Sequence, residues 1–239
     1  MSISLPLRSL GARLWPLLLP LVFPERCGAC DALGEAPFCA SCAETLLPLG
    51  AGCPLCCAPA DDALLPALKP RRCAHCREAP PPFARAAAPF QHGGALADAI
   101  HRLKYEGRED LARPLGLLFA GCDPPRADVV TPLPLHLSRL RQRGYDQAQL
   151  LAREAGRRFG LPVLGLLRRA RATRQQVGLD RPARERNLRG AFVAGPAARG
   201  LRICLIDDVL TTGATASAGA RALLDQGAAR VEVLTLARA

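Results

Sequence analysis

Eight of the eleven cysteines form four Cys-x-x-Cys pairs, all of them in the first third of the chain: Cys27/Cys30, Cys39/Cys42, Cys53/Cys56 and Cys73/Cys76. Eight residues separate the first two pairs, and sixteen separate the last two. The longer spacing is typical of zinc ribbons, and the shorter one is a compact version of it. Each turn can direct two thiolates at one metal ion, so the spacing predicts two structural zinc sites. The short loops favour sequential pairing, with interleaved pairing as the alternative.

A disulfide framework of a secreted protein is the other interpretation of these cysteines. Four regular pairs joined to a cysteine-poor remainder argue against it, and thiolates suited to zinc favour a reducing compartment such as the cytoplasm. The segment also has few large apolar residues, so a metal would supply much of its folding free energy. We expect Cys57 and His75, which lie beside or between the pairs, to take no part in metal binding.

The first 26 residues resemble a signal peptide only in part. An apolar stretch at 14–23 follows two arginines, but three prolines interrupt it and no small-x-small cleavage site precedes Cys27. We expect an amphipathic arm at 1–26, a double zinc-ribbon domain at 27–78, and an α/β domain at 83–239 after the stiff linker Ala79-Pro80-Pro81-Pro82. No apolar run reaches the roughly 18–20 residues of a spanning helix, so no membrane span is expected.

Positive charge is concentrated in the second part of the chain. The formal net charge is +11; residues 1–82 are neutral overall, and residues 83–239 carry all of the excess. Within them, residues 139–189 hold fourteen arginines and four acidic residues. This concentration predicts a polyanionic partner, either nucleic acid or a multiply phosphorylated small molecule, with a solvated helical face as the alternative.

Apolar periodicity beyond the linker predicts an α/β domain. Apolar positions recur at helical spacing over 94–103, 111–119, 144–159 and 216–224, and strands are predicted at 128–133, 201–206 and 231–236. The arginine-rich stretch 168–189 is predicted to be a polar excursion. Strand, helix and strand in succession at the C-terminal end form a βαβ unit, which predicts a parallel sheet.

The chemistry is concentrated in residues 205–215, with the sequence Leu-Ile-Asp-Asp-Val-Leu-Thr-Thr-Gly-Ala-Thr. An apolar strand delivers Asp207 and Asp208 at its carboxyl end, where α/β sheets bind ligands. Backbone N–H groups from Thr211 to Thr215, three hydroxyls and a helix N-terminus could then surround a phosphate group. Two adjacent carboxylates suit the vicinal hydroxyls of a ribose, and we expect both to face solvent. The stretch matches neither a Walker loop nor a dinucleotide-binding fingerprint; an ordinary helix cap is the alternative.

This stretch resembles the phosphoribosyl pyrophosphate (PRPP) signature of type I phosphoribosyltransferases, and nearly the whole chain resembles the ComF family of competence proteins and their GntX-like relatives. The resemblance includes the Phe-Pro-x-x-Cys-x-x-Cys opening and all four cysteine pairs. It continues through Leu103-Lys104-Tyr105, Pro132-Leu133-Pro134, Arg143 to Ala148, Thr173-x-x-Gln176, Arg184-x-x-Asn187 and Gly190-Ala191-Phe192. The chain has Tyr145-Asp146-Gln147 where the family usually has Phe-Asn-Gln, which leaves the role of Asp146 open.

The resemblance implies a type I phosphoribosyltransferase fold and a PRPP site. The 5-phosphate would bind to Thr211, Thr212, Gly213, Ala214 and Thr215, and the ribose hydroxyls to the catalytic pair Asp207 and Asp208. The pyrophosphate, with a Mg²⁺ ion, would face the turn of Pro132, Leu133 and Pro134 and be neutralised by Arg139, Arg141 and Arg143, or by arginines of the 168–189 excursion acting as a lid.

Two functions follow from the resemblance, and nothing in the chain identifies an acceptor. One is a phosphoribosyltransferase that transfers ribose 5-phosphate to an unknown nucleophile, in nucleotide metabolism or DNA uptake. The other is a non-catalytic accessory factor that binds single-stranded DNA, works with the competence machinery, and keeps the PRPP fold for sensing or structure.

Overall fold

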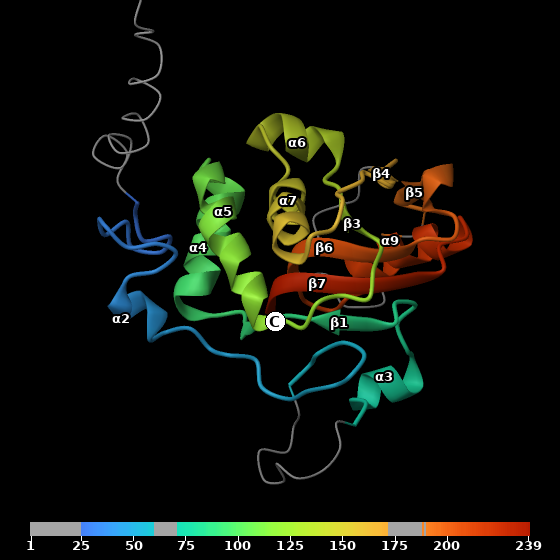
Figure 1. Cartoon of the computed structure of the whole chain (residues 1–239), viewed down its shortest axis with the longest axis horizontal. Helices are drawn as coiled ribbons and strands as arrows, with labels where there is room; N and C mark the ends of the chain where they lie inside the picture. Colours follow the sequence, from blue (N-terminus) through green and yellow to red (C-terminus); the bar gives the residue numbers. More distant parts are fainter. Residues whose placement is uncertain (1–24, 60–70, 172–187, 189) are drawn as a thin grey trace, which may run out of the picture.

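A computed structural model describes residues 25–59, 71–171, 188 and 190–239, and its centre is a five-stranded parallel sheet (Figure 1). The strand order is β1-β7-β6-β3, and β2 pairs with the far end of β7. The strands span Arg85–Ala87 (β1), Phe90–Gln91 (β2), Val129–Pro132 (β3), Arg202–Leu210 (β6) and Arg230–Arg238 (β7). The two central strands, β6 and β7, are nearly continuous apolar runs because both faces of the sheet are covered.

Three helices cover one face of the sheet, and α9 with a small two-stranded sheet covers the other. The first layer contains α4 (Gly94–Tyr105), α5 (Ala112–Gly116) and α7 (Gln147–Phe159), which share a core with Cys204 and Ile206 of β6 (Figure 1). On the other face, α9 (Ala214–Asp225) and the antiparallel pair β4 (Leu167–Arg169) and β5 (Phe192–Ala194) pack with Ile203 and Leu205. Alternate residues of β6 therefore face alternate layers.

The predicted βαβ unit is confirmed, since β6, α9 and β7 follow one another and β6 pairs with β7 in parallel. The predicted strand 201–206 is too short: β6 continues to Leu210, so Asp207 and Asp208 lie within the strand. The predicted helix 111–119 divides into the 3₁₀ turns Glu109–Leu111 and Leu117–Gly121 on either side of α5. Helix α6 (Leu137–Arg143) and strands β1, β2, β4 and β5 were not expected.

The excursion predicted at 168–189 is an ordered strand where it begins, because Arg168 and Arg169 belong to β4. Residues 172–187 and 189 of that stretch lie outside the described residues, as do residues 1–24 of the predicted arm and residues 60–70. Within the described ranges, no helix is long and apolar enough to cross a bilayer.

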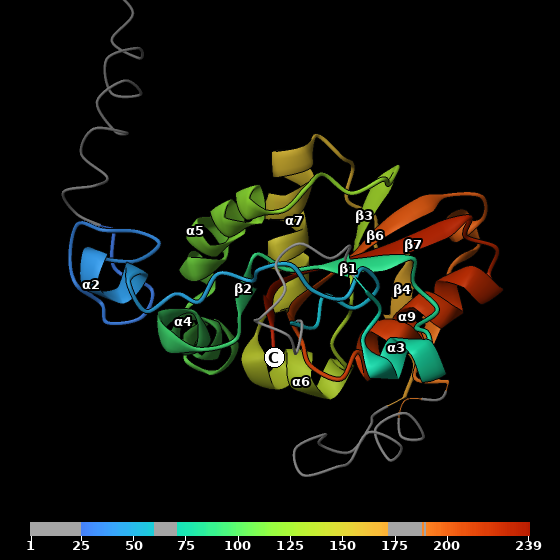
Figure 2. The same cartoon turned by 90° about the horizontal axis from the view of Figure 1, so that it is seen from below.

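The two cysteine groups lie at different places on the α/β core (Figure 2). The first carries the short helix α2 (Ala40–Ala43), and its Cys27 and Cys39 share a core with α4. The second carries α3 (Ala74–Glu78) and is attached to β1, where Ala86 N–H donates to the Leu55 carbonyl over 2.7 Å. The predicted architecture, an α/β fold with a cysteine-rich N-terminal region, is confirmed; the domain boundaries stay predictions.

Candidate functional site

The turn after β6 has the geometry of a phosphate-binding loop. Thr211 to Gly213 connect β6 to α9, and Gly213 caps the helix with φ +77°, a conformation that favours glycine. Thr212 Oγ1 accepts a hydrogen bond from Ala214 N–H over 3.4 Å. The helix N-terminus is therefore presented at the carboxyl end of the sheet, together with the hydroxyls of the turn. Such a terminus favours anions, because its first N–H groups have no partner within the helix.

Asp208 is buried in a polar cluster with the helical layer. Its Oδ1 lies 2.8 Å from Lys104 Nζ at the end of α4, and its Oδ2 accepts from Gln147 Nε2 at the start of α7 over 3.1 Å. The side chain of Asp208 is only 5% exposed, and that of Lys104 is 21% exposed. The expectation that both acids face solvent is therefore wrong for Asp208, because α4 and α7 close over this face of β6.

Arg143 extends this cluster to a third helix. Its guanidinium at the end of α6 donates to Gln147 Oε1 and lies 5.0 Å from the centre of the Tyr105 ring. Arg143 is half-buried, and its hydrogen-bond partner Gln147 also donates to Asp208. The arginine predicted to face pyrophosphate thus connects α4, α6 and α7 beside the acidic pair.

The charges in the cluster perturb one another. Burial disfavours the charged form of Lys104, but the Asp208 carboxylate outweighs it and raises the pKa of Lys104. Burial, and then repulsion from Asp208, raise the pKa of Asp207 to about 8. Burial lowers the pKa of Arg169, which lies in the field of Asp207 from β4 and stacks over the Phe192 ring at 5.3 Å. Asp207 and Asp208 are therefore electrostatically unequal despite being neighbours.

The Pro132–Pro134 turn lies beside the acidic pair. Strand β3 pairs with β6 so that Pro132 is opposite Ile206, and Leu133 N–H donates to the Ile206 carbonyl over 2.9 Å. The Leu133 side chain packs closely on α9, since a Cβ at Gly219 would lie 2.6 Å from Leu133 Cδ1. The turn is thus fixed against the helix that follows the phosphate-type loop.

Asp146 has a structural role that answers the question left by the sequence. Its Oδ1 accepts from the N–H groups of Ala148 and Gln149 at the start of α7, over 2.9 and 3.3 Å. Its Oδ2 accepts from Leu135 N–H over 2.8 Å. Asp146 therefore caps α7 and holds the segment after the Pro132–Pro134 turn; an asparagine would also supply the N-cap acceptor.

The structure thus brings most of the predicted site residues to one edge of the sheet. Asp207, Asp208, the loop 211–215, the turn 132–134 and Arg143 all lie there; Thr173, Gln176, Arg184 and Asn187 lie outside the described residues. The sequence assigned no individual role to Gln147, and it placed Arg169 only among the arginines of the 168–189 excursion that could act as a lid. No local signal identified the contact of Gln147 with Asp208, because Gln147 begins α7 and reaches β6 only through the packing of that helix.

The eight paired cysteines form two groups that fit zinc. Within each group the sulfur atoms lie within 4.8 Å of one another, and the Cys30–Cys39 and Cys56–Cys73 Sγ distances are both 3.6 Å. A tetrahedral ion with Zn–S bonds of about 2.3 Å needs sulfur atoms roughly 3.8 Å apart. The grouping is sequential, as predicted: Cys27, Cys30, Cys39 and Cys42 in one, and Cys53, Cys56, Cys73 and Cys76 in the other. All cysteines are free thiols, which argues against the disulfide framework.

The chain is similar to proteins named for DNA utilization and for competence. It is 31% identical to DNA utilization protein YhgH of Salmonella typhi over 91% of this chain and 99% of that protein. It is 29% identical to competence protein F of Haemophilus influenzae, over 71% of this chain and 79% of that protein. With competence protein ComFC of Bacillus subtilis it shares 30% identity over 62% of each chain.

No family model matches the chain. A solved glutamine PRPP amidotransferase from B. subtilis aligns with 57% of this chain and 27% of its own, at 23% identity and a TM-score of 0.37, which is weak. The fold and the cysteine groups define an α/β protein with a parallel sheet and two zinc-type clusters. By its likeness to the YhgH protein over nearly its full length, and to the competence proteins over 62–71% of it, the chain belongs to the ComF family.

We predict two zinc ions per chain, one in each cysteine group. Metal analysis of protein purified without chelator should return close to two zinc ions, and removing them should lower the melting temperature, because the thiolates otherwise lose the bonds that organise both segments. Well under one zinc ion per chain would refute the assignment.

Replacing the two acids one at a time should have opposite effects on stability. In Asp208→Asn, Lys104 keeps only a neutral partner in a buried site, so we expect a loss of about 2 kcal/mol. For Asp207 the folded pKa of about 8 exceeds the unfolded value of about 4, so ionisation opposes folding increasingly as the pH rises between them. Asp207→Asn should therefore gain stability relative to the parent across that pH range. Denaturant titrations of the parent and both variants at pH 5 and pH 8 measure these changes in the free energy of unfolding. An equal loss of stability in the two variants at pH 8 would contradict the prediction.

Proposed function

We propose that this chain binds PRPP, with its 5-phosphate on the loop 211–215 and its ribose on Asp207 and Asp208. The observation that carries the proposal is the order of elements at one strand end: two acids in β6, a turn with two hydroxyls, and the Gly213-capped N-terminus of α9, whose first turn adds the Thr215 hydroxyl. Helix N-termini receive phosphate groups through backbone N–H groups and the helix dipole.

The two carboxylates would bind the ribose in different ways. Lys104 and Gln147 hold Asp208 in place, so it offers a fixed acceptor to a hydroxyl group. Asp207 accepts a hydrogen bond from Asp208 N–H over 2.9 Å, and a hydroxyl group donating to it would favour its ionised form. Both carboxylates also help to tolerate positive charge at the sugar when pyrophosphate leaves.

The pyrophosphate would lie beside the Pro132–Pro134 turn, which adjoins Asp207 through the β3–β6 pairing. Arg143 and Arg139 of α6 provide positive charge near this turn. Mg²⁺ prefers oxygen ligands, and the Asp207 carboxylate with the oxygens of PRPP would supply them; when bound, it would neutralise part of the diphosphate charge. An acceptor that attacks the anomeric carbon would complete a phosphoribosyl transfer.

The names of the relatives connect this site to DNA. The chain resembles proteins named for DNA utilization and for competence, so we propose that it acts where DNA taken up by the cell is handled or used. The excess of arginine over residues 139–189 favours a second function, weak and sequence-independent binding of single-stranded DNA. The described part of that stretch has exposed arginines on α6, on α7 and at β4, among them Arg141, Arg153, Arg158 and Arg168.

We predict that Gly213→Ala weakens PRPP binding while a matched glycine change does not. Gly213 and Gly200 both have positive φ, +77° and +76°, so alanine strains the backbone similarly at each, by about 1 kcal/mol. Of the two, only Gly213 belongs to the phosphate-type turn, where it caps α9. Calorimetric titration with PRPP and Mg²⁺ should show a loss of affinity of tenfold or more for Gly213→Ala and little change for Gly200→Ala. Equal affinities in the two folded variants would contradict the site.

A pyrophosphate-release assay with a panel of nucleobases then separates catalysis from sensing. Release that depends on an added acceptor identifies a phosphoribosyltransferase. PRPP binding without release favours the non-catalytic interpretation.

DNA binding through the arginine-rich stretch predicts a particular salt dependence. The affinity for single-stranded DNA should fall steeply with salt, with a log–log slope of about −0.7 per phosphate contacted. Changing the exposed Arg153 and Arg158 to glutamine, and separately Arg168 and Arg171, should each flatten the slope by up to about 1.4. Arg169 is left intact because it stacks on Phe192 beside the acidic pair. The pair Arg113 and Arg199, also exposed, lies outside the stretch and is the control; a slope unchanged in both test variants would exclude these arginines as the DNA surface.

A further inference from the structure

The second cysteine group adjoins the phosphate-type loop. A cavity of about 110 Å³ is lined on one side by Cys73, His75 and Cys76 and on the other by Thr211, Thr212 and Gly213. Within the described part of the chain, His75 Nε2 is buried and has no hydrogen-bond partner. Residues more than a hundred positions apart thus enclose one small space, and a group that sequence analysis treated as a separate domain lies at the proposed ligand site.

Arg238 connects the two sides of this cavity. At the end of β7, its Nε donates to the Cys56 carbonyl over 3.2 Å, and its Nη1 donates to the Leu210 carbonyl over 3.0 Å. The same Leu210 carbonyl accepts from Ala239 N–H over 3.0 Å. One guanidinium group therefore joins a turn of the cysteine group to the residue immediately before the loop.

The cysteine turn that Arg238 holds is itself anchored to the core. Ala86 N–H of β1 donates to the Leu55 carbonyl over 2.7 Å, and the buried Cys57 packs in the same core as Leu210 and Ala214. A backbone hydrogen bond and the packing of Cys57 thus fix the turn 53–57 on the side that faces the sheet. On its other side, a metal ion bound to its thiolates would hold it.

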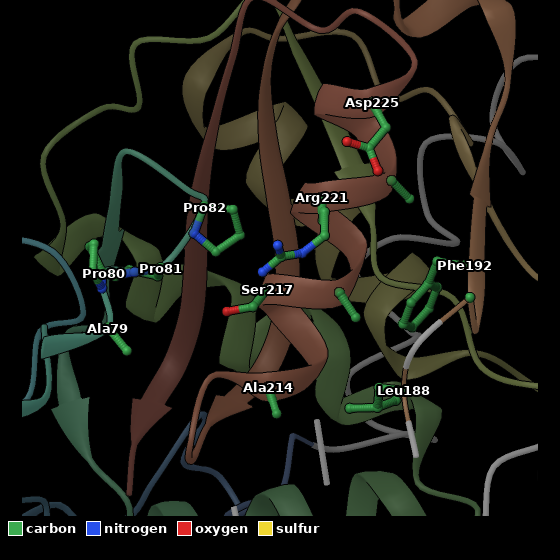
Figure 3. Close-up of a pocket in the computed structure, with 13 residues that line it drawn as sticks. Ala79, Pro80, Pro81, Pro82, Leu188, Phe192, Ala214, Ser217, Arg221 and Asp225 are labelled. Carbon is green, nitrogen blue, oxygen red and sulfur yellow. The ribbon is translucent and has the colours of Figure 1, made fainter. Parts of the chain in front are cut away.

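The linker 79–82, which comes after the second cysteine group in the sequence, lies opposite α9, the helix that begins at the phosphate-type loop. Figure 3 shows Ala79 to Pro82 facing α9 across a groove of about 480 Å³, into which Ser217 and Arg221 project. The group and its linker therefore border both the start and the outer face of α9. The first cysteine group packs instead against α4, where Arg102 donates to the Gly28 and Ala29 carbonyls over 3.3 and 3.2 Å.

We propose that the second cysteine group is a structural part of the phosphate site, with Arg238 as its positioning residue. With its four thiolates on one metal ion, the group holds the Cys56 carbonyl, and through Arg238 the Leu210 carbonyl, so that the turn 211–213 keeps the form that receives a phosphate group. This inference rests on the proposed function for the identity of the ligand. Because binding at coupled sites is reciprocal, a phosphate ligand should also increase the affinity of this group for its metal ion.

Matched cysteine variants of the full chain test the coupling. Cys73→Ser with Cys76→Ser removes two thiolates from the second group, and Cys39→Ser with Cys42→Ser does the same to the first. Titrated with ribose 5-phosphate, the second-group variant should lose affinity at least tenfold, and the first-group variant less than threefold. Equal affinities, or a larger loss in the first-group variant, would overturn the proposal.

A measurement without ligand covers the case in which a cysteine variant fails to fold. Amide hydrogen exchange over 205–217 should be several-fold faster in Arg238→Gln than in the parent, and Arg238→Lys, which can keep one of the two bonds, should fall between them. Arg230→Gln, at the other end of β7 and paired with Glu232, is the control and should leave this segment unchanged. Unchanged exchange in Arg238→Gln would overturn the inference. If the parent binds no ribose 5-phosphate, the proposed ligand fails, while the exchange result still decides whether Arg238 positions the loop.

Discussion

The ion pair between Lys104 and the buried Asp208 is the interaction on which the geometry of the site depends. It joins the end of α4 to the carboxyl end of the central strand, and Gln147 and Arg143 extend it to α7 and α6. A charge that is removed from water needs a partner, so each member fixes the position of the other. The helical layer, the acidic pair and the turn after β3 therefore meet at one place.

The sequence predicted the parts of this fold that have strong local signals. The apolar runs of β6 and β7 and the helix between them gave the βαβ unit, and the cysteine spacing gave both metal-type groups with the correct sequential pairing. The short strands β1, β2, β4 and β5 were missed because two or three residues show no periodicity, and they exist only through their long-range partners.

The candidate site was predictable in its residues but not in its contacts. The loop 211–215 and the two acids could be identified from one stretch of chain, since strand, turn and helix follow directly. The partners of Asp208 come from α4 and α7, more than sixty residues upstream, and the burial of Asp208 depends on how these helices pack. Likewise, no local pattern shows that Arg238 joins the second cysteine group to Leu210. A division into domains based on composition does not predict this contact between the cysteine-rich region and the α/β core.

The central claim is that the start of α9 receives the phosphate of a phosphoribosyl ligand. The most direct measurement is a titration of ¹⁵N-labelled protein with ribose 5-phosphate, followed by the backbone amide signals. The account predicts saturable shifts that are largest for Gly213, Ala214 and Thr215, with smaller shifts at Asp207 and Asp208. Saturable shifts confined to another part of the molecule, or none at millimolar ligand, would contradict it.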